Sequence, residues 1–505
     1  MLNLERLREQ INEQLLLWDQ ASMGLGIVKD GEVLLVDGFG LRDIENNIPA
    51  DGDTLYQIGS CSKAFTSAAA AILVDQGKLE WDKPLRDYLP WLRMKDSFVS
   101  EHVTTRDMLC HRTGLPRYDA WWICHTEVSR RDAAKGMRYM DNVCDFRAGW
   151  NYQNYCYIVI GLLIEELSGL TWEEFVKQNI LQPLGMKRTT FYQGVMESDG
   201  NYGKPYERAK ITDSKGFKPA ELLRSTVEDP EKGIGAAYGP AGSIISCASD
   251  MVKWVKFHLD NGKVGDRQLI SEANMKELHR MNMVIDEPIT GDWPEEDMHG
   301  YGMGWFIHSH RGHKFVEHGG NITGYSGYVA MIPDQNLGIV AFVNFDGSQM
   351  HNATAFEIID RILDIPESEN NWHERFREAR AKKVAALVEA SQKQKDDRIE
   401  NTSPSHAIAD YAGTYYNDAY RELEITEDNG VLTFRYGIEK SELEHYHYDT
   451  FRTCDESCML NDMLVRFVTG ADGKVSELHF DMDLDPRMKT AVFIRKEEKK
   501  TEENA

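Results

Sequence analysis

A serine and a lysine three residues apart, Ser60 and Lys63, are the residues in this sequence whose types and spacing most clearly suggest chemistry. They open a stretch of helix-forming residues, 61–75, which Gly77 is expected to end as a C-cap. Because residues three apart share a helix face, the hydroxyl and the amine can meet. A lysine whose pKa is lowered by burial and by the helix dipole can take the proton of a serine and make it a nucleophile.

The simpler alternative is that Ser60 only caps the helix and that Lys63 is a solvated side chain. Two observations favour the chemical interpretation. Ser60 is the only serine in the chain that is followed by a lysine three residues on. The helix face beyond it is too apolar for a surface helix, since it carries Phe65, Ala68, Ala69, Ile72 and Leu73.

A tyrosine and an asparagine, Tyr152 and Asn154, precede an apolar stretch, 155–167, that is expected to be helical and to end at Gly169. On a turn before a buried helix both side chains can face a cleft. The phenol could relay protons if a nearby ammonium lowers its pKa, and the amide could bind a substrate carbonyl. The same spacing recurs at residues 415–417, and that copy is assigned no function.

The segment 317–321 places His318, Gly319, Gly320 and Asn321 after an expected strand. Paired glycines allow a substrate backbone to lie along a strand edge. A backbone N–H in this segment, together with that of Ser60, could form an oxyanion hole, with His318 projecting into the same cleft. The alternative is an ordinary hairpin with a surface histidine.

The chain has 505 residues and a formal charge of −25, so we expect two domains and no binding to nucleic acid or to anionic lipid. Its eight cysteines include no C-x-x-C pair, which favours reduced thiols in a cytoplasm over disulfides or zinc. No stretch approaches the roughly 20 apolar residues that span a membrane, and the N-terminus lacks the apolar core of a signal peptide. The initiator Met1 also favours a cytoplasmic location.

The pattern of elements predicts an α+β fold. An N-terminal hairpin is expected around Asp30-Gly31, followed by a helical middle, and then by strands that include 325–332 and 337–344. The two ends are expected to form one antiparallel sheet covered by helices. The predicted divisions are a catalytic domain at 1–365, a charged helical linker at 366–407, a small all-β barrel at 408–496 and a charged tail at 497–505.

The order S-x-x-K, then Y-x-N, then H-G-G resembles the class C β-lactamase-like serine hydrolases, a family that includes penicillin-binding D-peptidases, D-aminopeptidases and esterases. The resemblance covers about residues 5–365, and the β region resembles a lipocalin-like barrel appended to some members. The stretches that support it are residues 77–84, 105–116, 238–243 and 301–305.

The resemblance implies a role for each matching residue. Ser60 would be the acyl-enzyme nucleophile, Lys63 its general base, Tyr152 the proton relay and Asn154 a binder of the substrate amide. The backbone N–H groups of Ser60 and Asn321 would form the oxyanion hole. His318 stands where many β-lactamases have the lysine of K-T-G, which puts β-lactamase activity in doubt and is similar to the peptidase and esterase branches.

The sequence therefore predicts a serine hydrolase without cofactor or metal that cleaves an amide or ester in a small molecule or short peptide. Peptidase or aminopeptidase is the first choice, and carboxylesterase or weak β-lactamase the second. A non-catalytic peptide-binding or assembly protein is the alternative from another class, and assembly into a homo-oligomer is left open. Trp121 and Trp122, with Tyr118, could line an acyl pocket or belong to the core. His308, His310 and His313 are expected to be solvated at a hairpin tip.

Overall fold

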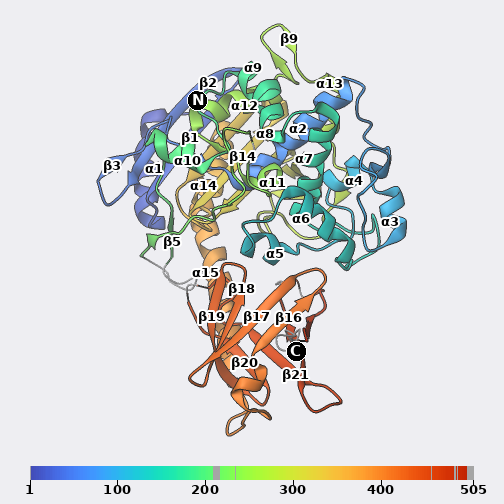
Figure 1. Cartoon of the computed structure of the whole chain (residues 1–505). Helices are drawn as coiled ribbons and strands as arrows, with labels where there is room; N and C mark the ends of the chain where they lie inside the picture. The colour runs from blue at the N-terminus through green and yellow to red at the C-terminus, as the bar shows by residue number, and fades with distance from the viewer. Residues whose placement is uncertain are drawn as a thin grey trace.

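The computed structural model describes residues 2–208, 216–233, 235–456, 458–482, 485 and 487–497. Within them the chain forms a nine-stranded sheet flanked by helices and a closed eight-stranded barrel. Figure 1 shows the barrel below the larger part, with the long helix α15 (Trp372–Asp396) leading from one to the other. The predicted α+β fold with a C-terminal barrel is confirmed.

As expected, the N-terminal hairpin and the later strands form one large sheet. Strand β1 lies between β15 and β2 and is antiparallel to both, with Ile27 opposite Ile339 and Leu35. The β1–β2 hairpin turns at Asp30 and Gly31, whose φ angles are 54° and 81°, and a two-residue turn of that kind matches the twist of the strands. Along the sheet the strands are β10 (Met283–Val284), β11 (Glu296–Tyr301), β12 (Phe306–His310), β13 (His313–Ile322), β14 (Tyr325–Ile332), β15 (Leu337–Val343), β1 (Ser22–Lys29), β2 (Glu32–Asp43) and β3 (Ile48–Pro49).

Helices cover both faces of this sheet. On one face α1 (Leu4–Trp18), α14 (Met350–Ile362) and the first turn of α15 share a core with the strands. On the other face α12 (Ala248–Leu259) packs on β1 and β15 and belongs to the same core as α2 (Ser62–Asp75) and α7 (Asn154–Ser168). On this face β13, an inner strand between β12 and β14, contacts the turn Gly59–Cys61 that leads into α2.

A helical subdomain is built around α7, which is buried from Asn154 to Ile164. Gly169 ends α7 with φ of 74°, and Thr171 opens the next helix with the capping box that its sequence predicts. In the described part of the chain no single helix has the length and apolarity of a membrane span, although α7 and the following segment Trp172–Leu184, bent by 74°, meet those limits as a pair. The other helices of the large part are α3 (Ser97–His102), α4 (Thr105–Leu109), α5 (Asp119–Cys124), α6 (Arg130–Gly136), α8 (Trp172–Val176), α9 (Gln182–Leu184), α10 (Gln193–Asp199), α11 (Gly239–Gly242) and α13 (Glu272–Leu278).

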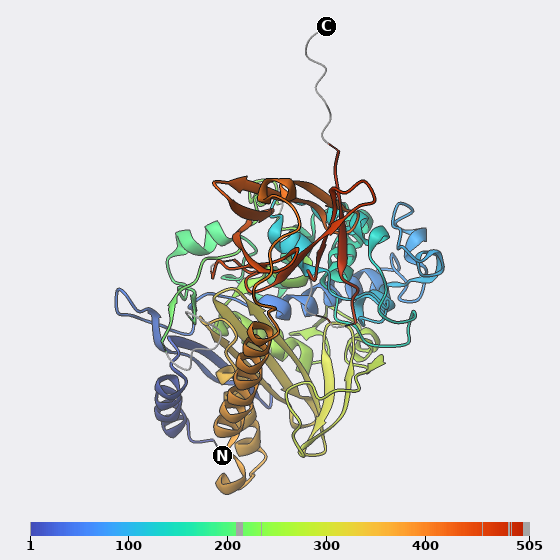
Figure 2. The same ribbon diagram turned by 90° about the horizontal axis from the view of Figure 1, so that it is seen from below.

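The barrel closes because its first strand pairs with its last. It lies against the helical subdomain, as the view from below in Figure 2 shows. The backbone N–H of Ile438 donates to the carbonyl of Cys124 at 2.8 Å, and the rings of Tyr118 and Tyr420 lie 5.3 Å apart. Its strands are β16 (Gly413–Asn417), β17 (Arg421–Asp428), β18 (Val431–Tyr436), β19 (Glu439–His447), β20 (Thr450–Thr453), β21 (Leu464–Thr469), β22 (Val475–Phe480) and β23 (Ala491–Arg495).

The hairpin of β11 and β12 differs from the expectation of a solvated tip at His308, His310 and His313. Strand β11 was not predicted, and β12 runs from Phe306 to His310, so two of these histidines lie within that strand. The prediction that His308 and His310 are solvated is wrong, because they are only 2% and 0% exposed. His310 pairs with Asp360 of α14 at 2.8 Å, a contact between residues far apart in the sequence. His313 is partly exposed and pairs with Asp334.

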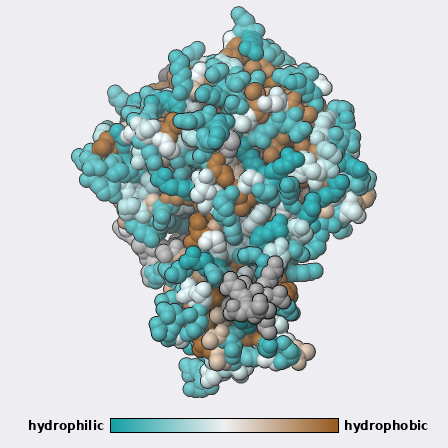
Figure 3. Space-filling model, viewed as in Figure 1, coloured by the Kyte–Doolittle hydropathy of each residue, from teal (hydrophilic) through white to brown (hydrophobic). Residues whose placement is uncertain are grey.

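The surface agrees with the strongly acidic composition. Figure 3 shows a face that is mostly hydrophilic, with apolar side chains scattered over it. The domain limits inferred from the sequence stay a prediction, although α15 lies inside the predicted linker 366–407. The predicted tail lies outside the described residues except for Glu497.

Candidate active site

Ser60 lies in a short 3-10 turn, Gly59–Cys61, that leads directly into α2. Gly59 has φ of 51°, a conformation that glycine adopts without strain. The side chain of Ser60 caps no helix, because the N-cap of α2 is Cys61 and that cap has no side-chain hydrogen bond. The Ser60 Oγ atom instead lies 3.0 Å from Lys63 Nζ and 2.8 Å from the hydroxyl of Tyr152. The structure thus brings together the three residues that the sequence proposes as catalytic.

Lys63 is completely buried, and its amine makes three contacts. It donates to the Asn154 Oδ1 atom and to the carbonyl of Ala241, both at 2.8 Å, and it faces Ser60 Oγ at 3.0 Å. Burial lowers the pKa of Lys63 well below its usual value, and the nearby cation of Arg117 lowers it further. A neutral amine has two N–H bonds and one lone pair. With both N–H bonds accepted by carbonyl oxygens, the lone pair faces the Ser60 hydroxyl and can accept its proton.

Tyr152 donates its hydroxyl hydrogen to Ser60 Oγ and keeps that hydrogen at neutral pH. Burial raises the pKa of Tyr152, and the hydrogen bond to Ser60 offsets only part of the rise. From the sequence, a nearby ammonium could lower the pKa of this phenol, but in the structure that pKa is raised. The ring packs 4.5 Å from the ring of His111, and the guanidinium of Arg117 lies 5.2 Å from its centroid. Tyr152 is thus a neutral donor beside the nucleophile.

Asn154 links the amine of Lys63 to a carboxylate that the sequence interpretation missed. Its Oδ1 atom accepts from Lys63, and its Nδ2 atom donates to Asp119 at 3.0 and 3.2 Å. Asp119, at the start of α5, also accepts from Arg117 and from the indole of Trp122. Both ends of the Asn154 amide are therefore bound to protein groups, which suits positioning of Lys63. Asp119 follows Arg117 and Tyr118 in the sequence. A single carboxylate there forms no motif from which its role could be predicted.

The edge of β13 lies directly against the turn that holds Ser60. A Cβ atom on Gly320 would stand 1.9 Å from the carbonyl oxygen of Ile58 and 3.0 Å from the backbone nitrogen of Ser60. A Cβ atom on Gly59 would stand 2.8 Å from the backbone nitrogen of Asn321. Glycine is needed for this close approach. The backbone amides of Ser60 and Asn321 thus lie on neighbouring segments, the arrangement that two oxyanion donors require.

Other predicted site residues are held by protein contacts of their own. The Asn321 side chain donates to Asp346 and accepts from Ser326, so only its backbone is offered to the site. Gly319, unlike Gly320, has room beside its Cα, since the nearest atom to an added Cβ would be 3.9 Å away. Trp121 is 5% exposed and stacks on Tyr155 at 6.3 Å, a core position. The half-buried Trp122 donates to Asp119, as described above, and its ring lies 5.1 Å from that of Tyr238.

His318 is buried and neutral. Its Nδ1 atom donates to the carbonyl of Gly319 at 2.6 Å, and its Nε2 atom accepts from the hydroxyl of Tyr301 at 2.8 Å. Burial, with a smaller contribution from the nearby Lys63, lowers the pKa of His318 to about 3. Its ring lies 6.3 Å from that of Tyr152. His318 therefore supports the site as a neutral group and supplies no cation. The contact of Tyr301 with His318, like that of Asp119 with Asn154, is one that no short sequence pattern indicates.

Comparison with known proteins identifies the family to which the chain is similar. A family model described as Beta-lactamase matches residues 17–363, and a model for a domain of unknown function (DUF3471) matches residues 397–495. An unguisins hydrolase of Aspergillus campestris is 28% identical over 444 residues, covering 83% of this chain and 77% of its own. The protein flp of Staphylococcus aureus strain MW2 is 26% identical over 324 residues, or 63% of this chain and 59% of its own.

Two solved structures share the fold. The octameric penicillin-binding protein homologue of Pyrococcus abyssi has a TM-score of 0.63 at 22% identity, covering 97% of this chain and all of its own. The D-amino acid amidase of Ochrobactrum anthropi SV3 has a TM-score of 0.55 at 21% identity, covering 72% of this chain and 97% of its own. The first similarity extends over both the sheet domain and the barrel.

Proposed function

The chain belongs to the beta-lactamase family and is a serine hydrolase, and on that premise we propose that it cleaves amide bonds in small peptides or aminoacyl amides through an acyl-enzyme on Ser60. The observation that carries the proposal is the setting of the Lys63 amine, which is buried, bound through both N–H groups and directed at Ser60 Oγ. A binding protein would have no need of a desolvated lysine in contact with a serine hydroxyl.

In the proposed acylation, Lys63 takes the proton of Ser60 as Oγ attacks the substrate carbonyl carbon. The negative charge that forms on the carbonyl oxygen is stabilised by the backbone N–H groups of Ser60 and Asn321. Tyr152 gives its proton to the departing nitrogen and regains one from the Lys63 ammonium. The carbon–nitrogen bond then breaks and leaves an ester on Ser60. Water attacks that ester in the second half of the reaction, with the proton transfers reversed.

Two considerations favour an open-chain amide over the strained cyclic amide of a β-lactam. Similarity to a hydrolase of unguisins and, in fold alone, to a D-amino acid amidase makes amides the first class to test. His318 stands where many β-lactamases carry a lysine, but its neutral, hydrogen-bonded ring offers no positive charge to a substrate carboxylate.

A fluorophosphonate probe tests the chemistry, and a substrate panel tests the class. We expect the probe to label Ser60 in native protein, as located by mass spectrometry, and to label nothing in Ser60→Ala. The panel compares kcat/KM for D- and L-aminoacyl amides, short peptides, short-chain esters and a chromogenic β-lactam. Hydrolysis of esters alone would replace the amidase proposal with a carboxylesterase. Absence of Ser60 labelling would contradict the acyl-enzyme itself.

A further inference from the structure

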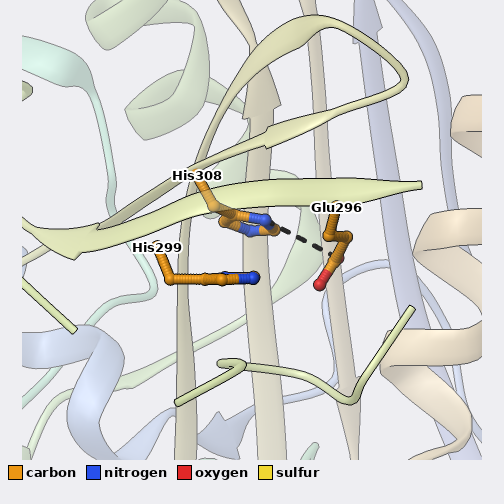
Figure 4. A group of neighbouring side chains, drawn as sticks. All are labelled: Glu296, His299 and His308. Carbon is orange, nitrogen blue, oxygen red and sulfur yellow. Dashed lines mark ion pairs between the residues drawn. The ribbon is translucent and has the colours of Figure 1, made fainter. Parts of the chain in front are cut away.

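Three side chains on the β11–β12 hairpin meet outside the Ser60 site. Glu296 and His299 come from β11 and His308 from β12, and their candidate ligand atoms all lie within 4.8 Å of one another. Figure 4 shows the two imidazole rings and the carboxylate gathered on one side of the hairpin. Glu296 and His308 are 8% and 2% exposed, and His299 is half-buried.

An irregularity in β11 makes this meeting possible. Residues three apart on a regular strand point to opposite faces, so Glu296 and His299 should diverge. The pairing of β11 with β12 shifts between Asp297 and Gly300, and Met298 has φ of 55°. Such a bulge adds one residue to the strand and returns the next side chain to the first face. His299 thereby joins Glu296, while the Met298 side chain is exposed to solvent.

The polar atoms of the cluster are largely unpaired within the described residues. The Oε2 atom of Glu296 accepts from the hydroxyl of Thr290 at 2.8 Å, but its Oε1 atom has no hydrogen-bond partner. Both ring nitrogens of His308 and the Nδ1 atom of His299 are likewise buried without a partner. Buried polar atoms are nearly always paired, and the described side chains supply no partner for these. His310, two residues from His308, differs in part, because its Nε2 atom is 2.8 Å from Asp360 while its Nδ1 atom also has no partner.

The charges around the cluster favour a cation. Glu317 of the neighbouring strand β13 is a second buried carboxyl group close to Glu296. Among the described ion pairs, Glu296 has no partner other than His308. The guanidinium of Arg375 pairs with Glu295 and not with Glu296. A divalent cation in contact with the Glu296 carboxylate would balance its charge directly.

We propose that Glu296, His299 and His308 bind one divalent transition-metal ion, with Zn²⁺ the best match to the donor set. Two imidazoles and one carboxylate form a zinc ligand set, and they leave a fourth position open. The His308 Nδ1 and Glu296 Oε1 atoms are 3.6 Å apart, near the spacing of about 3.3 Å expected for two ligands of a tetrahedral zinc ion. The hydroxyl of Thr290 would orient the carboxylate from behind.

The ion would join β11 to β12 beside the catalytic site without taking part in its chemistry. Strand β11 ends at Tyr301, whose hydroxyl donates to His318. A metal that fixes the hairpin would hold Tyr301 in place. Its role is therefore structural, and its effect is measured through binding and stability.

Metal binding is tested on the full chain without an affinity tag. After dialysis against a chelator, the protein is titrated with Zn²⁺, and with Co²⁺ as a spectroscopic substitute. We expect one ion per chain and the visible absorption of tetrahedral cobalt. His299→Ala and Glu296→Gln should abolish both signals. His313→Ala is the matched control, since that histidine lies on the neighbouring strand and pairs with Asp334. It should bind like wild type.

Thermal unfolding gives a second readout, because an ion that binds only the folded state raises Tm. Zn²⁺ should raise the Tm of wild type and of His313→Ala, and it should leave that of His299→Ala unchanged. His299 is the least buried of the three ligands, so its alanine variant is the one best suited to remain folded. Wild-type protein that takes up no stoichiometric ion, or a His299→Ala variant that binds as tightly as wild type, would overturn the proposal.

Discussion

In the proposed mechanism Lys63 acts as the base, and its surroundings suit that role before substrate arrives. Burial lowers the pKa of its amine and so favours the uncharged form, and the carbonyl oxygens of Asn154 and Ala241 accept its N–H bonds. The same oxygens would favour an ammonium, but burial is the largest cause acting on the Lys63 pKa and lowers it. The site therefore depends on the closed packing around α2 and α7 rather than on an acidic partner in direct contact with the amine.

The first prediction concerns the nucleophile. Ser60→Ala should abolish turnover while the protein remains folded, because among the described residues the Ser60 hydroxyl hydrogen-bonds to Lys63 and Tyr152 and it caps no helix. Steady-state hydrolysis and circular dichroism measure the two outcomes. Activity above about one hundredth of wild type would show that Ser60 is not the nucleophile, since the loss of such a group costs far more.

The second prediction concerns the two groups that contact Ser60 Oγ. Lys63→Met and Tyr152→Phe should each slow acylation by about 10²–10⁴-fold, the usual contribution of a positioned acid or base. Their losses should not add in the double variant, because both residues act on one proton path. Single-turnover kinetics measure the acylation rate. Tyr88→Phe is a suitable control, since its hydroxyl accepts only from the backbone of Glu80 outside the site. Fully additive losses would mean that the two residues act separately.

The third prediction follows from the lowered pKa of Lys63. The free enzyme is active when the amine is neutral, so kcat/KM should fall as pH drops through the Lys63 pKa. Arg117 lowers that pKa by charge repulsion. Arg117→Gln should therefore raise the Lys63 pKa and move the acid limb of the profile to higher pH. The raised pKa of Tyr152 keeps its phenol protonated on the alkaline side. An acid limb that does not move, or that moves to lower pH, would contradict this assignment.

At the scale of elements, the close approach of β13 to the Ser60 turn requires glycine at position 320 but not at position 319. Gly320 leaves no room for a side chain beside Ile58 and Ser60, whereas Gly319 does. This difference supplies the fourth prediction. Gly320→Ala should push β13 from the turn, separate the two proposed oxyanion donors and reduce kcat by about 10²–10³-fold, the usual cost of losing one such donor. The matched variant Gly319→Ala should remain close to wild type. Equal losses in both would contradict the inference.

Local signals predicted much of the fold, and long-range contacts account for most of what was missed. Gly77 and Gly169 end helices where expected, because a C-terminal glycine acts within a few residues. Strand β11 escaped notice because the bulge at Met298 breaks the alternation by which strands are recognised. His310 was misplaced because its partner comes from α14, 50 residues away.

The candidate site divides in the same way. Ser60 and Lys63 are neighbours on one helix turn, so their spacing alone predicts that they meet. Asn154 was noticed for its own motif, but its attachment to Asp119 depends on how α5 packs against α7. No spacing within either helix reports that packing, which explains why the carboxylate was missed.

At the scale of the whole molecule, the barrel contacts α5, the helix that carries Asp119. Asp119 binds Asn154, which in turn binds the Lys63 amine. The buried apolar core continues from the helical subdomain into the barrel interior. Arg421 of β17 lies over the rings of Trp121 and Tyr139, at 5.5 and 5.1 Å. A cleft of about 430 Å³ remains at this junction and is lined by both parts, but no residue of the proposed catalytic set lines it. The barrel therefore supports α5, which carries Asp119.

The last prediction is that the barrel governs which substrates reach Ser60 and does none of the chemistry. Truncation after Asp397, the C-cap residue of α15, should leave Ser60 reactive toward a small fluorophosphonate. It should change the ratio of kcat/KM between short and long substrates, because a docked domain narrows access and excludes large ones. A series of peptides or esters of increasing length, assayed with both forms, measures that ratio.

Truncation also exposes the apolar surface around Trp121, so a second variant is needed that keeps the barrel. Gly437 has φ of 58°, and a Cβ atom there would stand 2.0 Å from the carbonyl oxygen of Cys124. Gly437→Val should therefore loosen docking in the full chain and shift the length preference in the same direction as truncation. Identical ratios in all three proteins at every length would mean that the barrel does not control access. A role of the barrel in oligomerisation, which the sequence left open, would then be the better account, and comparison of the masses of the full and truncated forms in solution would test it.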